Sequence, residues 1–233
     1  MKKKMLFLCL IILLVSCEKK KRTEPRPSSD ETRIFSAMGT SPEEKRGPIP
    51  GPPLKVRNEA TFQEKIAQAA EKQIGVTRRY DPAYSRLGYP MGDVPLEKGV
   101  CTDVVVRALR AVRIDLQEKV HEDMKKAFSA YPKMWGLKKP DPNIDHRRVP
   151  NLMVFFERSG HSLKIEKNPE GYRSGDIVAW KLGSGRLHIG IVTRKKINGR
   201  EVPLIVHNIG RGAQLEDFLF EAQIIGHYRI DSP

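Results

Sequence analysis

Cysteine is scarce in this chain of 233 residues, which has three. Cys9 and Cys17 lie close to the N-terminus, and Cys101 is the one cysteine that follows them. If the first two are cleaved off or modified, no disulfide can form within the remaining chain. A cysteine without a partner is either a small buried apolar residue or a reactive thiol.

Aromatic residues are also few, at 7% of the chain, and none are interleaved with basic residues as in RNA-binding proteins. We therefore expect no nucleic-acid partner, although the formal net charge is +14. That charge suits an anionic surface such as an envelope polymer or lipid headgroups, or it serves solubility alone. Long apolar runs are missing too. The longest, residues 5–15, is too short to span a bilayer comfortably.

The N-terminus has the features of a secretory signal. Three lysines at positions 2–4 precede the apolar run, and the sequence Leu14-Val15-Ser16-Cys17 resembles a bacterial lipobox. This resemblance implies a signal peptide over residues 1–16, cleavage before Cys17, and acylation of its thiol. Glu18 at the next position resembles Gram-negative sorting patterns for the outer membrane. We therefore expect a lipid anchor in the bacterial envelope, facing the periplasm. An ordinary signal and an uncleaved anchor are the alternatives.

Residues 17–57 are predicted to be a tether. Seven of the 17 prolines lie in residues 18–57, among many charges and with little to bury. The folded domain is therefore expected over residues 58–233.

Hydrophobic spacing predicts helices first and strands later. Helical periodicity covers residues 58–75, 101–113, 116–131 and 150–159. A capping box of Thr61 and Glu64 marks the first helix. Short alternating segments follow at residues 176–182, 186–196, 201–209 and 223–230. This order predicts an α+β fold whose C-terminal half is an antiparallel sheet.

Cys101 follows a glycine, Gly99, and begins a predicted helix. Unpaired N–H groups at a helix start favour a thiolate, so we expect a thiol pKa well below the free value of about 8.5. A nucleophilic thiol also needs a base, for which imidazole is suited.

Two histidines, His188 and His207, lie in strands that flank a predicted Asn198-Gly199 turn. A two-residue turn places His207 opposite Gly190, on the same sheet face as His188. His188 is then the candidate base and His207 its orienting partner, as in a catalytic triad. An odd loop or a bulge near Pro203 would bring Asn208 to that place instead. No third metal ligand has convincing spacing, so neither a metal nor another cofactor is expected.

Other polar residues are candidates for substrate binding. Asp103 and Arg107 are four apart on a helix and are expected to pair, although Asp103 is also a candidate substrate contact. The segment Asp145-His146-Arg147-Arg148 either grips a substrate carboxylate through its arginines or caps the helix that follows.

The order of a cysteine at a helix start, "SGDIVAWKLGSGRLHIGIV" and "LIVHNIG" resembles the NlpC-type papain-like peptidases. More closely, "IGVTRRYDPAYSRLGYPMGDVPLEKGVCTDVVVRALR", "DPNIDHRRVPNL" and "VHNIG" resemble domain of unknown function 1287, over roughly residues 60–230. The resemblance implies a papain-like fold with helices packed on an antiparallel sheet. It also implies Cys101 as nucleophile, His188 as base and His207 as the third polar residue. A tyrosine before the cysteine would support the oxyanion, Tyr89 by spacing or Tyr80 as its competitor. The chain departs from the NlpC pattern at "VCTD", where those enzymes have "DCSG".

The resulting hypothesis is an envelope-anchored cysteine hydrolase that cleaves an amide bond, with peptidoglycan stem peptide as its substrate by analogy of fold and compartment. An amide or acyl transferase that uses the same thiol is one alternative. A non-catalytic cell-wall binding module with the same fold is another.

Overall fold

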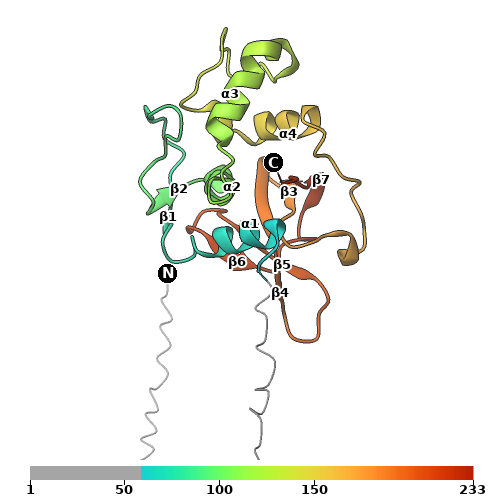
Figure 1. The fold of residues 1–233 in the computed structure, drawn as a ribbon. Coiled ribbons are helices and arrows are strands. Elements are labelled where there is room, and N and C mark those ends of the chain that lie inside the picture. The colour runs from blue at the N-terminus through green and yellow to red at the C-terminus, as the bar shows by residue number, and fades with distance from the viewer. Residues whose placement is uncertain (1–58, 233) are drawn as a thin grey trace, which may run out of the picture. The chain divides into compact units, whose positions relative to one another are not determined.

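The computed structural model describes residues 59–232, so the predicted signal peptide, Cys17 and the tether lie outside the described residues. The helices come first along the chain and the main strands later (Figure 1). The helical part comprises α1 (Phe62–Glu71), α2 (Cys101–Arg110), α3 (Leu116–Ala127) and α4 (Val149–Arg158). Short 3₁₀ helices lie at Phe128–Ala130, Asp145–Arg147 and Pro169–Gly171. None of the helices in residues 59–232 has the length and apolar character needed to cross a membrane.

The predicted antiparallel sheet is present. It has five strands in the order β6-β5-β4-β3-β7. Their bounds are β3 (Ile177–Lys181), β4 (Leu187–Lys196), β5 (Pro203–His207), β6 (Gln214–Glu216) and β7 (Gln223–Tyr228). A second, two-stranded sheet pairs β1 (Arg79–Tyr80) with β2 (Lys98–Gly99) in parallel. The sequence analysis did not predict β1, β2 or β6.

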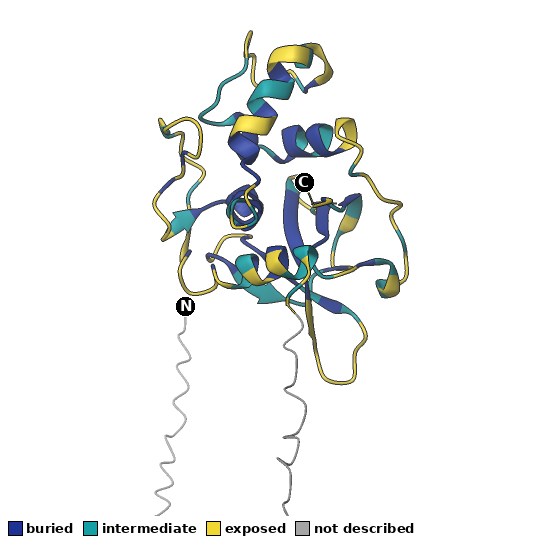
Figure 2. Ribbon diagram, viewed as in Figure 1, coloured by how far each residue is buried: buried dark blue, intermediate teal, exposed yellow. Residues whose placement is uncertain are grey.

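Each face of the five-stranded sheet carries its own apolar cluster. Residues from α1, α2, α3 and α4 pack with Ile177, Ile189, Ile191 and Val206. The other face holds Val178, Trp180, Val192 and Ile205, which are covered by Tyr172 and Leu219. The alternation along β4 follows the period of two for strands. Figure 2 shows that α2 and the central strands are buried.

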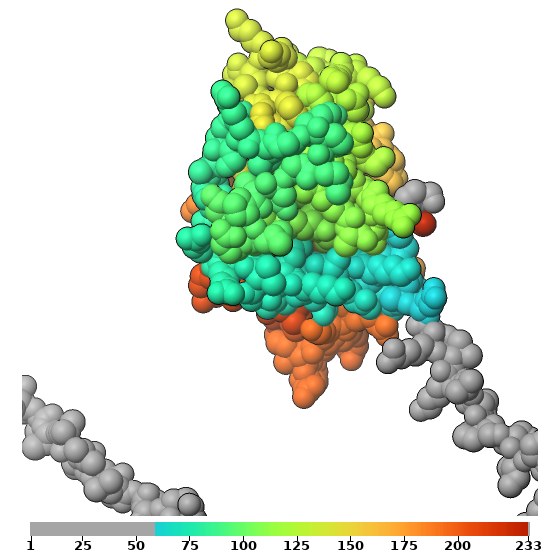
Figure 3. All heavy atoms as spheres, turned by 60° about the vertical axis from the view of Figure 1, so that its left-hand side comes forward, coloured from blue at the N-terminus to red at the C-terminus, as the bar shows by residue number. Residues whose placement is uncertain are grey.

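The chain between α1 and α2 covers the side of the domain that Figure 3 shows. The β4–β5 hairpin protrudes at the bottom of the same view. The α+β prediction is therefore confirmed. Cys101 begins a helix packed on an antiparallel sheet, which is the layout expected for the papain-like fold.

Candidate active site

Local chemistry at the start of α2 explains why the helix begins at Cys101. Val100 is the N-cap, and its N–H donates to Asp103 Oδ2 at 2.6 Å. Gly99 must lack a side chain here, because a Cβ would lie 2.9 Å from that same carboxylate oxygen. The pair of Gly99 and Asp103 thus directs the chain sharply into the helix and holds Cys101 in its first turn.

The thiol lies at the edge of β4. Val192 N–H donates to Asp176 O, so even-numbered residues of β4 direct their main-chain groups toward β3. Ile189 therefore directs its N–H toward β5, which has already ended at His207 opposite Gly190. This Ile189 N–H is close enough to the Cys101 sulfur to lower the pKa of the thiol. The thiol is consequently beside the peptide that joins His188 to Ile189.

Burial dominates the titration of this thiol. Loss of solvation raises the pKa of Cys101 to about 12, although the N–H groups of Ile189, Thr102 and Cys101 lower it. The charge of Asp103 adds to the increase. The prediction of a depressed thiol pKa is therefore wrong, because the helix-start N–H groups do not compensate for burial. Burial therefore favours the protonated thiol over the thiolate.

The two histidines contact each other as the strand register predicted. Gly190 pairs with His207, and the rings of His188 and His207 are joined by a 2.7 Å contact between Nε2 and Nδ1. The pairing shifts by two residues toward Pro203, where Lys196 is its partner. A shift of two keeps the same side chains on each face, so the bulge near Pro203 does not bring Asn208 to His188.

Apolar surroundings keep the histidine pair neutral. Trp180 and Phe218 pack 5.9 and 5.7 Å from the His188 ring. Burial, followed by the nearby His207, lowers the pKa of His188 to about 3. Burial also lowers the pKa of His207, against the opposing effect of Glu216. A neutral imidazole can accept a proton, as a general base must.

Glu216 is a residue of this site that the sequence analysis missed. Its Oε2 lies 2.8 Å from His207 Nε2. Glu216 ends β6, and β6 pairs with β5 next to His207. The segment Gln214–Glu216 is only three residues long and lacks strong alternation, so its pattern did not indicate a strand. A third strand that follows β5 and pairs with it would have placed Glu216 near His207, but it had to be recognised from its position after β5 and not from its own pattern.

Asn208 has a structural role. Its Nδ2 donates to Gly99 O at 2.9 Å, and its Oδ1 accepts the N–H groups of Gly210 and Gly212 at 3.2 Å each. These bonds tie the end of β5 to the residues that precede Cys101. Asn208 therefore helps to hold the two halves of the site together, while His207 is the residue that bonds to His188.

Of the two candidate tyrosines, Tyr80 is the one beside the thiol. Tyr80 and Cys101 line the same pocket, and burial followed by the Cys101 charge raises the pKa of Tyr80. Tyr89 instead donates to Glu122 at 3.1 Å and packs against His121. The choice of Tyr89 by spacing is wrong, because a loop and not a continuous helix connects it to Cys101.

Arg147 was predicted to bind a substrate carboxylate, but its guanidinium is occupied by other groups of the protein. Its guanidinium forms a buried, bidentate pair with Asp103 at 2.9 and 3.0 Å and also donates to Asp81 O and Ala83 O. Arg107, expected to pair with Asp103, binds Asp93 instead at 2.8 Å. Asp103 and Arg147 are therefore structural, since each is fully occupied by its internal partners.

Asp145 and His146 also point inward. Asp145 accepts the N–H of Asp141 at 2.5 Å and a hydrogen bond from Arg148 at 3.3 Å. Burial lowers the pKa of His146 to about 4. Both side chains are buried, so neither is available to a substrate, and the prediction of substrate contacts here is wrong.

A pocket of about 420 Å³ lies in front of Cys101. Tyr80, Trp135 and Leu187 supply apolar walls, and Arg148 and Arg186 supply positive charge. The Arg148 guanidinium lies 4.0 Å above the Trp135 ring and is paired with Asp145. Arg186 is exposed and has no ion-pair partner within residues 59–232. The pocket is thus an apolar groove with one uncompensated cation beside the thiol.

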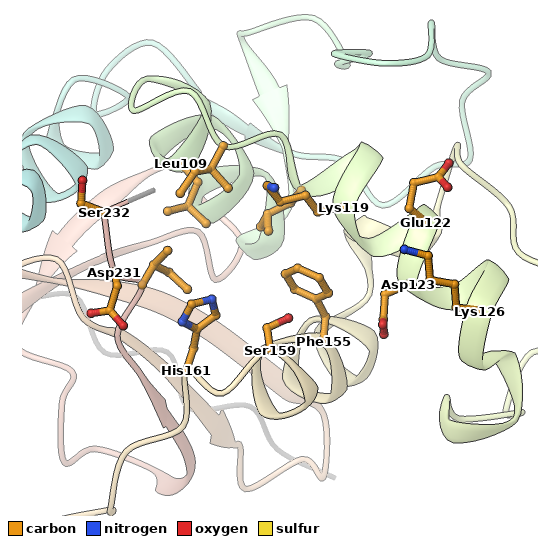
Figure 4. Close-up of a pocket in the computed structure, with 13 residues that line it drawn as sticks. Leu109, Lys119, Glu122, Asp123, Lys126, Phe155, Ser159, His161, Asp231 and Ser232 are labelled. Atoms are coloured by element: carbon orange, nitrogen blue, oxygen red, sulfur yellow. The ribbon is translucent and has the colours of Figure 1, made fainter.

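A second cavity, of about 520 Å³, lies between α3, α4 and the C-terminal residues (Figure 4). Leu109 and Phe155 form part of its apolar lining, and Lys119, His161 and Asp231 lie around it. Cys101 lines the first pocket and not this cavity, and His188 and His207 line neither of the two. The pocket in front of Cys101 is therefore the candidate active site.

The chain matches a protein-family model and is similar to two known proteins. The family described as "Domain of unknown function (DUF1287)" matches residues 67–230. The uncharacterized protein YijF of Escherichia coli (strain K12) is 53% identical over 178 residues, which are 76% of this chain and 86% of that protein. A solved structure of NlpC1 from Trichomonas vaginalis has 13% identity and a TM-score of 0.40, with 74% of this chain covered. This chain spans 45% of that one. The family match and the identity to YijF establish that the chain belongs to the DUF1287 family.

Proposed function

We propose that this protein is a thiol-dependent hydrolase that cleaves an amide bond with Cys101 as nucleophile and His188 as base. The observation that carries the proposal is the His188–His207 pair, joined at 2.7 Å, next to the peptide against which the Cys101 sulfur lies. His188 Nε2 is engaged by His207, so Nδ1 is the nitrogen that we propose receives the thiol proton.

The first half of the reaction transfers an acyl group to the enzyme. The thiol proton moves to His188 Nδ1 as sulfur attacks the carbonyl carbon and a C–S bond forms. The C–N bond then breaks, and His188 Nδ1 returns the proton to the departing amine. Burial raises the pKa of Cys101 and lowers that of His188, so we propose that deprotonation accompanies attack.

The second half releases the acyl group. Water gives a proton to His188 Nδ1 as its oxygen attacks the thioester carbonyl, and the C–S bond breaks. The sulfur recovers the proton, and a carboxylic acid leaves. The N–H of Cys101 at the helix start is the proposed donor to the oxyanion, with the Tyr80 hydroxyl as its support. One such donor is typically worth roughly 3–4 kcal/mol of transition-state stabilisation.

The proposed substrate is a peptidoglycan stem peptide at the envelope. The pocket beside Cys101 supports an extended peptide with apolar contacts, and the exposed Arg186 supports a substrate carboxylate near the cleaved bond. The proposed location is the periplasmic face of the outer membrane, through a lipid on Cys17. This part of the proposal rests on the lipobox-like residues 14–17 and on Glu18.

Burial of the thiol favours a second candidate, a non-catalytic binding module. Cys101 is only 5% exposed, so a bound peptide would have to reach it from the pocket. A transferase that passes the acyl group to an amine is the third possibility, since the same acyl-enzyme serves both reactions.

Mass spectrometry of purified peptidoglycan fragments incubated with the full-length protein tests these candidates. New fragments with a free carboxylate are expected with the wild type and not with Cys101→Ala. Fragments joined to an added amine would indicate transfer. Unchanged fragments that co-purify with both proteins would indicate binding without catalysis, and hydrolysis would be rejected.

A further inference from the structure

A carboxylate and two imidazoles form a continuous hydrogen-bonded series behind the thiol. Glu216 Oε2 lies 2.8 Å from His207 Nε2, and His207 Nδ1 lies 2.7 Å from His188 Nε2. Each residue comes from a different strand, in the order β6, β5 and β4. Both histidines are buried, so water does not compete for these nitrogens.

The donor and acceptor capacities of the carboxylate and the two imidazoles determine which ring nitrogen of each histidine carries the hydrogen. A carboxylate only accepts, so His207 Nε2 must carry the hydrogen between it and Glu216. A neutral imidazole has a single N–H, which leaves His207 Nδ1 as an acceptor. His188 Nε2 must then donate to it. His188 Nδ1 consequently keeps its lone pair, on the nitrogen that a base for Cys101 requires.

We propose that Glu216 is a positioning residue that sets the tautomers of both histidines and thereby makes His188 Nδ1 an acceptor. The inference rests on the proposed function only for its effect on Cys101 chemistry. The tautomers themselves are a property of the three side chains.

The contact between Arg211 and Glu216 allows the role of Glu216 to be tested by substitution. Its Nη2 donates to the other carboxylate oxygen, Glu216 Oε1, at 3.1 Å. In a Glu216→Gln variant, an amide NH₂ at the Oε1 position would face the Arg211 donor, so the amide oxygen is favoured at that position, even though the Arg211 side chain is exposed to water. The amide NH₂ then faces His207 Nε2 and donates to it. The hydrogen moves to His207 Nδ1, His188 Nε2 becomes an acceptor, and His188 Nδ1 carries the hydrogen.

The experiment measures ¹⁵N chemical shifts of the imidazole nitrogens in the full-length protein near pH 7. The wild type is expected to have hydrogen on Nε2 of both histidines, and Glu216→Gln to have it on Nδ1 of both. The acylation of Cys101 by p-nitrophenyl acetate, with Cys101→Ala as background, is expected to slow by about a hundredfold or more, as for a base in the wrong tautomer.

Two further variants separate the tautomer effect from a loss of structure. In the Arg211→Ala, Glu216→Gln double variant, the amide is free to turn its oxygen to His207, so the wild-type tautomers and most of the acylation rate should return. Asp217→Asn is the matched control, since Asp217 pairs with Arg200 and not with a histidine. It should leave both readouts unchanged.

The proposal is wrong if His188 keeps hydrogen on Nε2 in Glu216→Gln, or if the double variant fails to restore it. These results do not depend on a cell-wall substrate. Inverted tautomers together with intact peptidoglycan fragments would therefore reject the proposed hydrolase and retain the role of Glu216.

Discussion

Asp103 and Arg147 form a bidentate ion pair in which both side chains are almost completely buried, at 2.9 and 3.0 Å. Asp103 also caps α2, and Arg147 also binds two carbonyls in the segment that follows β1. The pair therefore fixes the first turn of α2, which contains Cys101, against two loops that come from distant parts of the chain.

Breaking this ion pair should strongly destabilise the fold. Arg147→Met leaves the Asp103 charge buried and unpaired, and removal of one partner of a buried pair costs about 3–5 kcal/mol of unfolding free energy. Urea unfolding measures the loss. Glu97→Gln is the control, because the exposed Glu97–Arg79 pair should contribute less than about 1 kcal/mol. Equal effects of the two substitutions would contradict the assigned role.

Alkylation of Cys101 should require unusually high pH. Burial raises the pKa of the thiol to about 12, and only the thiolate reacts. The rate with iodoacetamide should therefore continue to rise above pH 10 in the folded protein. In urea the same thiol should titrate near about 8.5. A folded-state rate that levels off at or below pH 8.5 would show that the thiol is a preformed thiolate.

Substitutions at His207 and Asn208 should have different consequences. His207→Ala removes the partner of His188 Nε2, and the rate of Cys101 acylation by p-nitrophenyl acetate should fall by about a hundredfold or more. Asn208→Ala removes three hydrogen bonds to Gly99, Gly210 and Gly212, so it should mainly lower the thermal midpoint. Circular dichroism serves as the folding control. If Asn208→Ala slows the acylation of Cys101 and His207→Ala does not, then Asn208 and not His207 is the partner of His188.

The lipid anchor is tested by Cys17→Ser. Residues 14–17 predict cleavage before Cys17 and acylation of its thiol, so the variant should persist as an unprocessed precursor that incorporates no fatty-acid probe. Wild-type protein should be shorter and labelled. Equally weak labelling of both proteins would argue for an ordinary signal or an uncleaved anchor.

Local sequence signals predicted the helices and the long strands well. The capping box at Thr61 and Glu64 is present, and α2 begins at Cys101 as its pattern indicated. The two-residue turn predicted at Asn198-Gly199 gave the correct pairing of Gly190 with His207. These features depend on neighbours within a few residues, so the sequence contains their determinants.

Contacts between distant segments were harder to predict. The partner of Asp103 is 44 positions away at Arg147, and not the helical neighbour at Arg107. Glu216 reaches His207 through a three-residue strand that has no pattern of its own. The thiol pKa depends on how completely the site is covered, which no local motif encodes.

The exposed end of the β4–β5 hairpin has a practical consequence. Residues 194–201 are exposed and protrude beyond the sheet, while His188 and His207 lie at the opposite ends of the same two strands (Figure 1). An affinity tag or fluorophore inserted at Asn198-Gly199 would therefore be held by both strands yet remain remote from the chemistry. Surface turns of this kind tolerate insertion best. The hairpin thus offers an attachment point for immobilising or tracking the protein that leaves its N-terminus unaltered.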